Sequence, residues 1–135
     1  MASTSIVLVV STLIHGLVRN PDRQDLGRIE DLAIDISSGR VVYAVLSFHG
    51  LLGFENKLFA IPWDAFNFDP DDKTMVLEVS AETLENAPSF DKDDWPDMNE
   101  GAWGEAIYQH YGYVPYWQVS PPQKRVVIED SLRRE

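Results

Sequence analysis

The sequence predicts a mainly β protein: a small antiparallel barrel of about six strands, then a short helix and a helical, aromatic C-terminal tail. Three observations predict this fold class. Short apolar runs separated by turn-forming residues fill residues 13–79. None of these runs needs a helix to explain its pattern. Aromatic residues then concentrate between residues 90 and 117.

Composition limits the possible functions. The chain has 135 residues, 44% of them hydrophobic, which is enough apolar material for one domain with a real core. Its formal net charge of −11 would repel a phosphate backbone, so we expect no nucleic-acid partner. Cysteine is absent, which excludes disulfides, thiolate metal sites and a cysteine nucleophile. We expect a cytoplasmic protein.

The first 12 residues form a separate N-terminal segment. Residues 6–10 are aliphatic, but the run is too short to span a membrane, which takes about 20 apolar residues. The β-branched content favours an extended segment, either a buried strand or an arm docked on the domain. The alternative is a degenerate targeting segment, although no basic stretch precedes the run.

Turn residues set the limits of the first predicted strands. Asn20, Pro21 and Asp22 indicate a turn, and Gly39 can adopt a positive φ between two apolar runs. In the run of residues 28–36 the alternation of apolar side chains slips by one position. A β-bulge near Glu30 and Asp31 would restore it.

The run of residues 41–46 is apolar on both faces. Such a strand is expected to be covered on both sides, by the core and by something else. The second cover is either the C-terminal tail or another subunit. Further strands are predicted at residues 57–61 and 75–79, separated by a solvated acidic turn at residues 69–72.

Two helices are expected after the strands. Residues 81–86 are typical of one helical turn, which Pro88 stops. Trp103, Ile107 and Tyr111 recur every four residues, and the pair Asp97 and Glu100 resembles a capping box, so a helix is predicted at about 98–111. Residues 125–128 are predicted to add an edge strand. We therefore expect a barrel domain at 13–90 and an acidic, aromatic extension at 91–135.

Four segments, in this order and at compatible spacing, carry a family resemblance: residues 26–31, 39–41, 48–53 and 61–66. Together they resemble the PRC-barrel family, which is named after the photosynthetic reaction-centre H subunit. The resemblance covers about residues 13–90. The pattern Tyr-Gly-x-x-Pro-Tyr-Trp at residues 111–117 is similar to the tail of free-standing bacterial members, and we expect a member of that kind.

The resemblance implies a barrel of about six antiparallel strands that docks onto larger assemblies and carries no known catalytic constellation. Within the matching segments, Pro62 is expected to end a strand, Trp63 to pack as core or lid, and Asp64 to cap the following turn. The residues expected to serve as structural motif positions are Gly27, Asp31, Gly39, Gly53, Pro62, Trp63 and Asp64.

Neither the acidic loop nor the histidines match the spacing of a metal-binding motif. Asp69, Asp71 and Asp72 share one loop, but the glycine and glutamate positions of an EF-hand are filled by Thr74 and Ser80. The three histidines lack the spacing of a helical zinc motif. We expect no metal, no cofactor and no catalytic residue. Paired carboxylates at Glu55 and Asp64 would be the basis of a hydrolytic enzyme, the third hypothesis.

The leading hypothesis is a protein-interaction module that forms a homodimer, without a membrane span. A small-ligand-binding barrel is the alternative. The contact is expected on the doubly apolar strand, on the loop of residues 51–54 or on the aromatic tail. The interaction candidates are Val42, Tyr43, Leu51, Leu52, Phe54, Trp103, Tyr108, Tyr111, Tyr116 and Trp117.

Overall fold

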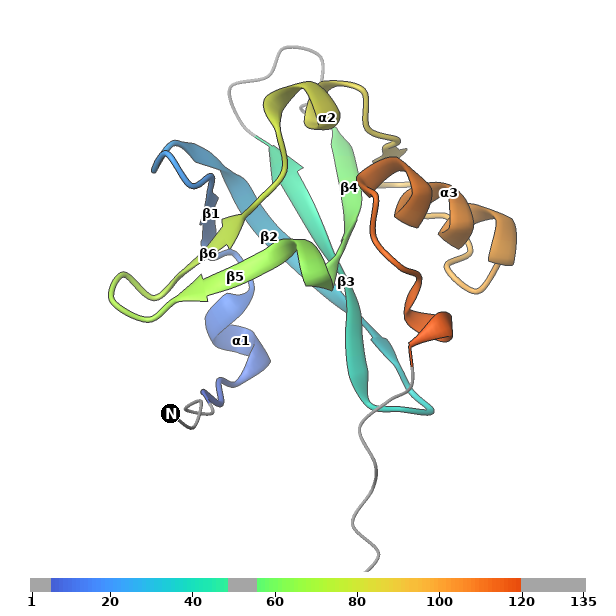
Figure 1. The fold of residues 1–135 in the computed structure, drawn as a ribbon, viewed down its shortest axis with the longest axis horizontal. Helices are drawn as coiled ribbons and strands as arrows, with labels where there is room; N and C mark the ends of the chain where they lie inside the picture. The colour runs from blue at the N-terminus through green and yellow to red at the C-terminus, as the bar shows by residue number, and fades with distance from the viewer. Residues whose placement is uncertain (1–5, 49–55, 120–135) are drawn as a thin grey trace, which may run out of the picture.

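The structure is a computed structural model that describes residues 6–48 and 56–119 (Figure 1). Seven strands lie in this part of the chain: β1 (Leu17–Arg19), β2 (Asp25–Asp35), β3 (Arg40–Phe48), β4 (Lys57–Pro62), β5 (Phe66–Asp69), β6 (Thr74–Leu77) and β7 (Phe90–Asp91). The helices are α1 (Val10–Leu13), α2 (Ala81–Glu85), α3 (Gly101–Tyr111) and the 3-10 turns η1 (Trp63–Ala65) and η2 (Tyr116–Gln118).

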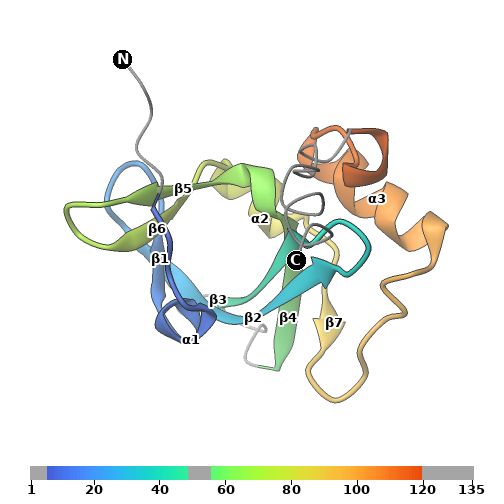
Figure 2. The ribbon, with the colours of Figure 1, turned by 90° about the horizontal axis from the view of Figure 1, so that it is seen from below.

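The strands form one sheet in the order β5-β6-β1-β2-β3-β4-β7, curled around a common centre but not closed (Figure 2). The predicted mainly β fold with short helices is confirmed. All neighbouring strands pair antiparallel except β1 and β6, which are parallel, with Val18 beside Met75. The sequence predicts an all-antiparallel barrel, and its apolar runs do not predict β5 or the two-residue strand β7.

The bulge predicted near Glu30 and Asp31 is present. The register between β2 and β3 shifts between Ile29 and Asp31, and the Asp31 carboxylate accepts the Leu32 backbone N–H at 2.8 Å. A second shift, which the alternation did not reveal, lies between Ala33 and Ile34. The two irregularities bend β2, so that the sheet curls instead of lying flat.

Glycines act at two of the positions that the sequence singled out. Gly39 has a φ of +75° in the turn between β2 and β3, as predicted. At Gly27 the backbone of β3 leaves no room for a side chain: a Cβ atom there would lie 1.9 Å from the Ser47 carbonyl oxygen. Only glycine allows the two backbones to approach this closely.

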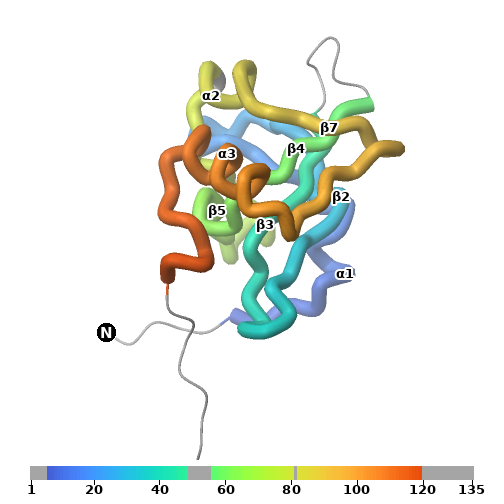
Figure 3. Tube along the Cα trace, turned by 90° about the vertical axis from the view of Figure 1, so that its right-hand side faces the viewer, coloured from blue at the N-terminus to red at the C-terminus, as the bar shows by residue number. Residues whose placement is uncertain are grey.

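The core lies inside the curl and is apolar. Its largest fully buried side chains include Ile29, Tyr43, Leu46, Phe59, Ile61 and Leu77. Strand β3 is buried from Val42 to Leu46, so it is covered on both faces, as predicted. One cover is the core, and the other is α3 with the segment that follows it, seen on the same side of the molecule in Figure 3.

The N-terminal segment differs from its prediction. Val9 has extended backbone dihedral angles, residues 10–13 form the helical turn α1, and none of the side chains of residues 6–10 is buried. The expectation of a buried strand is therefore wrong. We call residues 6–10 the N-terminal arm.

The two later helices are present, with one correction. Helix α2 begins after Ser80, whose hydroxyl accepts the Thr83 backbone N–H at 3.1 Å. Helix α3 begins at Gly101 instead of about residue 98, and the predicted capping box is wrong. The Asp97 carboxylate accepts the N–H of Asn99, and Glu100 forms no side-chain cap.

At the connection between β4 and β5, Pro62 and Trp63 lie as expected and Asp64 does not. Pro62 ends β4, and Trp63 packs half-buried with its ring centroid 5.8 Å from that of Phe66. Asp64 is exposed, and in the described part of the chain it forms no cap hydrogen bond. The expected cap is therefore wrong. The predicted edge strand at 125–128 and Gly53 lie outside the described residues.

We predict that Gly27→Ala lowers the free energy of unfolding by about 3 kcal/mol, because the new methyl group meets backbone atoms that cannot move aside. Urea denaturation followed by circular dichroism measures the change. Gly101→Ala is the matched control, since a Cβ at that helix position meets nothing within 4 Å. Because Gly101 is the first residue of α3, the change in stability should stay within about 0.5 kcal/mol. Equal effects of the two substitutions would contradict the close-approach argument.

Candidate interaction surfaces

Five aromatic side chains gather on the outer face of β3. We call them the aromatic cluster: Tyr43, Trp103, Tyr108, Tyr116 and Trp117. The Tyr43 ring lies at the centre, with ring centroids 5.2 Å from Trp103, 5.5 Å from Tyr108 and 6.3 Å from Tyr116. Trp117 stands edge-on to Tyr108 at 5.7 Å. Aromatic pairs in these arrangements stabilise packing beyond the area that they bury.

A glycine in α3 makes this packing possible. The buried stripe of α3 consists of Gly104, Ile107, Tyr108 and Tyr111. A Cβ atom on Gly104 would lie 3.1 Å from the Trp117 ring and 3.2 Å from the Tyr43 hydroxyl. Gly104 therefore provides the space into which Trp117 and Tyr43 fit.

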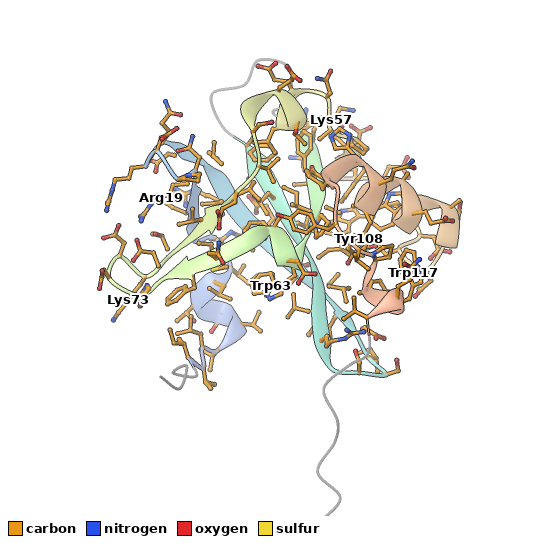
Figure 4. All side chains as sticks on the ribbon, viewed as in Figure 1. Arg19, Lys57, Trp63, Lys73, Tyr108 and Trp117 are labelled. Atoms are coloured by element: carbon orange, nitrogen blue, oxygen red, sulfur yellow. The ribbon has the colours of Figure 1, made fainter. Side chains whose placement is uncertain are left out.

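The chain reverses after α3 and returns to the β2–β3 turn. Gly112 ends the helix with a φ of +77°. Arg40 then holds the returning segment: its guanidinium donates to the carbonyl oxygens of Tyr116 and Val119, each at 3.0 Å. Figure 4 shows Tyr108 and Trp117 together on this side of the sheet. The tail therefore packs on its own domain, which answers the alternative that the sequence left open.

The buried tyrosine hydroxyls of the cluster, and that of Tyr111 on the same helix, differ in their partners. Tyr108 donates to the Val42 carbonyl oxygen at 3.2 Å. The hydroxyls of Tyr43 and Tyr111 are buried with no hydrogen-bond partner among the described residues. Burial raises the pKa of all three tyrosines far above the usual value, because the phenolate would lose its hydration. The cluster is thus an uncharged packing surface.

The interaction candidates fall into three groups in the structure. Val42, Tyr43, Tyr108 and Tyr111 are buried within the chain. Trp103 and Tyr116 are half-buried, and Trp117 keeps 44% of its surface exposed. Leu51, Leu52 and Phe54 lie outside the described residues. Most of the described aromatic candidates therefore pack within the chain.

A different apolar surface lies at one end of the barrel, around the N-terminal arm. A pocket of about 240 Å³ opens there between the arm, α1 and the sheet. All of its lining residues have aliphatic, aromatic or thioether side chains: Ile6, Leu8, Val10, Leu13, Leu32, Val41, Trp63, Phe68 and Met75. We call this pocket the apolar mouth. Trp63 is labelled in Figure 4, below η1 and beside β3.

The arm presents alternate side chains to the mouth. Ile6, Leu8 and Val10 line it, while Val7 and Val9 are 90% and 67% exposed. The distribution of charge along the sequence also distinguishes this surface. Residues 1–18 contain no Asp, Glu, Lys or Arg, although the chain as a whole is strongly acidic. An uncharged aliphatic stretch in such a chain favours contact with something other than water.

The titratable groups in the described part of the chain form no candidate metal site. No group of three or more His, Asp or Glu side chains there could hold a metal ion. In the acidic turn, Asp72 lies 2.6 Å from Arg19, and Asp69 pairs with the same guanidinium. Asp69 also accepts backbone N–H groups of its own turn, which lowers its pKa. The turn therefore joins β1 to the β5–β6 hairpin, near Arg19 and Lys73 in Figure 4.

Of the possible carboxylate pair Glu55 and Asp64, Glu55 lies outside the described residues, and so does His49. His110 bonds the Thr83 carbonyl oxygen at 2.8 Å, and His15 lies 3.5 Å from Glu30. No described helix has the length and apolar content to cross a membrane.

We predict opposite effects of the same chemical change at two tyrosines. Tyr108→Phe removes a buried hydrogen bond and leaves the Val42 carbonyl without it, which should cost about 1 kcal/mol. Tyr43→Phe removes a hydroxyl that has no partner among the described residues, so stability should stay equal or rise. Paired urea titrations measure both. A loss at Tyr43 as large as that at Tyr108 would contradict the assignment of partners.

Comparison with known proteins agrees with this architecture. A model of the PRC-barrel domain matches residues 10–84, more than half of the chain. No curated protein sequence matches it. The match begins at α1, includes β1 to β6 with the strands that form the mouth, and ends within α2. Together with the curled sheet and the helix after it, this shows that the chain belongs to the PRC-barrel family.

Proposed function

We propose that the chain is a non-catalytic protein-interaction module that self-associates as a homodimer through the N-terminal arm and the apolar mouth. The family match supports a module of this type. The observation that carries the proposal is the run of five exposed or partly exposed aliphatic side chains, residues 6–10, beside an apolar pocket. Monomers rarely leave such a continuous apolar patch uncovered.

Other segments of the same chain cover two of the surfaces expected to make the contact. Strand β3 was a candidate contact because both of its faces are apolar, but the core and the tail of the same chain cover both. The aromatic cluster is largely occupied in the same way. Val7 and Val9 have no comparable cover in the described residues. Among the described residues, the exposed side chains of the arm therefore support a contact there.

Charge favours the arm as the site of self-association. Two copies that each carry a net charge of −11 repel one another, so a contact forms most easily where neither copy brings charge. The first charged residue of the chain is Arg19, beyond the arm and α1. Contact through the arm therefore adds no like-charge pair at the interface.

Further parts of the proposal rest on composition. A cytoplasmic setting fits a chain without cysteine. The acidic balance opposes nucleic-acid binding. We propose residues 13–90 as the barrel domain, residues 1–12 as the segment that carries the arm, and residues 91–135 as an extension whose described part covers β3.

We expect sedimentation equilibrium of the protein at 10–500 micromolar to show a monomer–dimer equilibrium. The double substitution Val7→Ser and Val9→Ser should weaken the dimer at least tenfold, equivalent to about 1.4 kcal/mol, because it removes apolar area from the contact. Ile36→Ser is the matched control, since Ile36 is 87% exposed in the turn between β2 and β3. It should leave the dimer unchanged. A monomer at every concentration, or equal loss with the control, would refute this interface.

A second candidate function is the binding of a small apolar ligand in the mouth. The pocket of about 240 Å³ and its apolar lining favour this function. Native mass spectrometry of protein purified without detergent should then show a retained mass that disappears in the Val41→Trp variant, whose larger side chain fills the pocket. Unliganded protein only, in repeated preparations, would remove this candidate.

A further inference from the structure

The backbone of the N-terminal arm is available for pairing. Val9 has φ −74° and ψ 144°, the conformation of an extended chain. The Val9 carbonyl oxygen, at the start of α1, accepts the Thr12 backbone N–H at 3.0 Å. The N–H groups of residues 6–9 and the carbonyl groups of residues 6–8 have no backbone partner among the described residues.

The composition of the arm is that of a strand that pairs readily. Residues 6–10 are Ile, Val, Leu, Val and Val, with no charge, proline or glycine. Short segments of high β propensity and low charge, with an unpaired edge, act as templates for another strand. Proteins usually block such edges with charges, prolines or bulges, and residues 6–10 contain neither a charge nor a proline.

We propose that the arms of two copies pair as antiparallel strands about a two-fold axis, forming a two-stranded ribbon across the dimer. The inference rests on the proposed self-association and specifies its geometry. A two-fold contact must be complementary to itself. An uncharged extended strand that is apolar on both faces meets this condition, and a second copy supplies the same strand in the opposite direction.

The pairing explains both faces of the arm. Successive side chains of a strand point to opposite faces, so Ile6 and Leu8 remain towards the apolar mouth while Val7 and Val9 point away. In the ribbon each of these side chains gains a neighbour across the pair, which is the interaction that stabilises strand pairing. The unpaired N–H and carbonyl groups gain partners at the same time.

The absence of cysteine permits a direct test by cross-linking. Five variants each carry one cysteine, at position 6, 7, 8, 9 or 10, and are oxidised at a concentration at which the protein is dimeric. Directly opposite Cα atoms in an antiparallel pair lie about 4.5–5.5 Å apart, within disulfide reach. A residue opposes its own copy only at the two-fold axis. We therefore expect disulfide dimers at one position or two adjacent ones, falling at least fivefold two residues away.

Controls separate the possible failures. Ile36→Cys, exposed on another element, gives the background of random collision, and light scattering measures the dimer in each reduced variant. Similar cross-linking at all five positions would indicate parallel strands and overturn the inference. Dimers that cross-link only at background overturn the strand pairing but leave the proposed self-association intact. Wild-type protein that is monomeric at the same concentration overturns both.

Discussion

The two-sided burial of β3 is the constraint on which the rest of the structure depends. Its residues from Val42 to Leu46 are all buried, with one face in the core and the other under α3 and the returning tail. A strand apolar on both faces cannot lie at the surface of a soluble sheet. The aromatic cluster, the space left by Gly104 and the two hydrogen bonds from Arg40 to the tail all keep that second cover in place.

This internal cover changes where an interaction surface can be. Once the tail covers β3, most aromatic residues near the C-terminal end of the described chain are used for packing, and an exposed run of aliphatic side chains remains beside the mouth of the barrel. The mouth is formed by segments distant in sequence: the arm, β2, β3, η1, β5 and β6. The same curl of the sheet that encloses the core thus brings Leu32, Phe68 and Met75 beside the arm.

The sequence predicted features of the fold that depend on neighbouring residues, but it did not predict pairings between distant strands. The slip in alternation after Ile29 located the bulge, and Gly39 located a turn, because each depends on a few neighbouring residues. The parallel pairing of β1 with β6 was not predictable, since it joins residues more than 50 positions apart. The capping box failed because the Asp97 carboxylate binds the N–H of Asn99 and the helix begins later.

The candidate site was predicted less well, for a physical reason. The sequence around Tyr43 and Tyr108 looks the same whether these side chains pack on their own sheet or on a partner. The path of the chain after Gly112 decides which of the two occurs. The N-terminal arm is different, because its lack of charge stands out against a chain of net charge −11. Like charges on two acidic domains repel most within the screening length of about 8 Å at physiological salt. A contact made by extended, uncharged arms forms without pressing charged faces together, so the distribution of charge along the chain and the exposure of the arm favour the same mode of association.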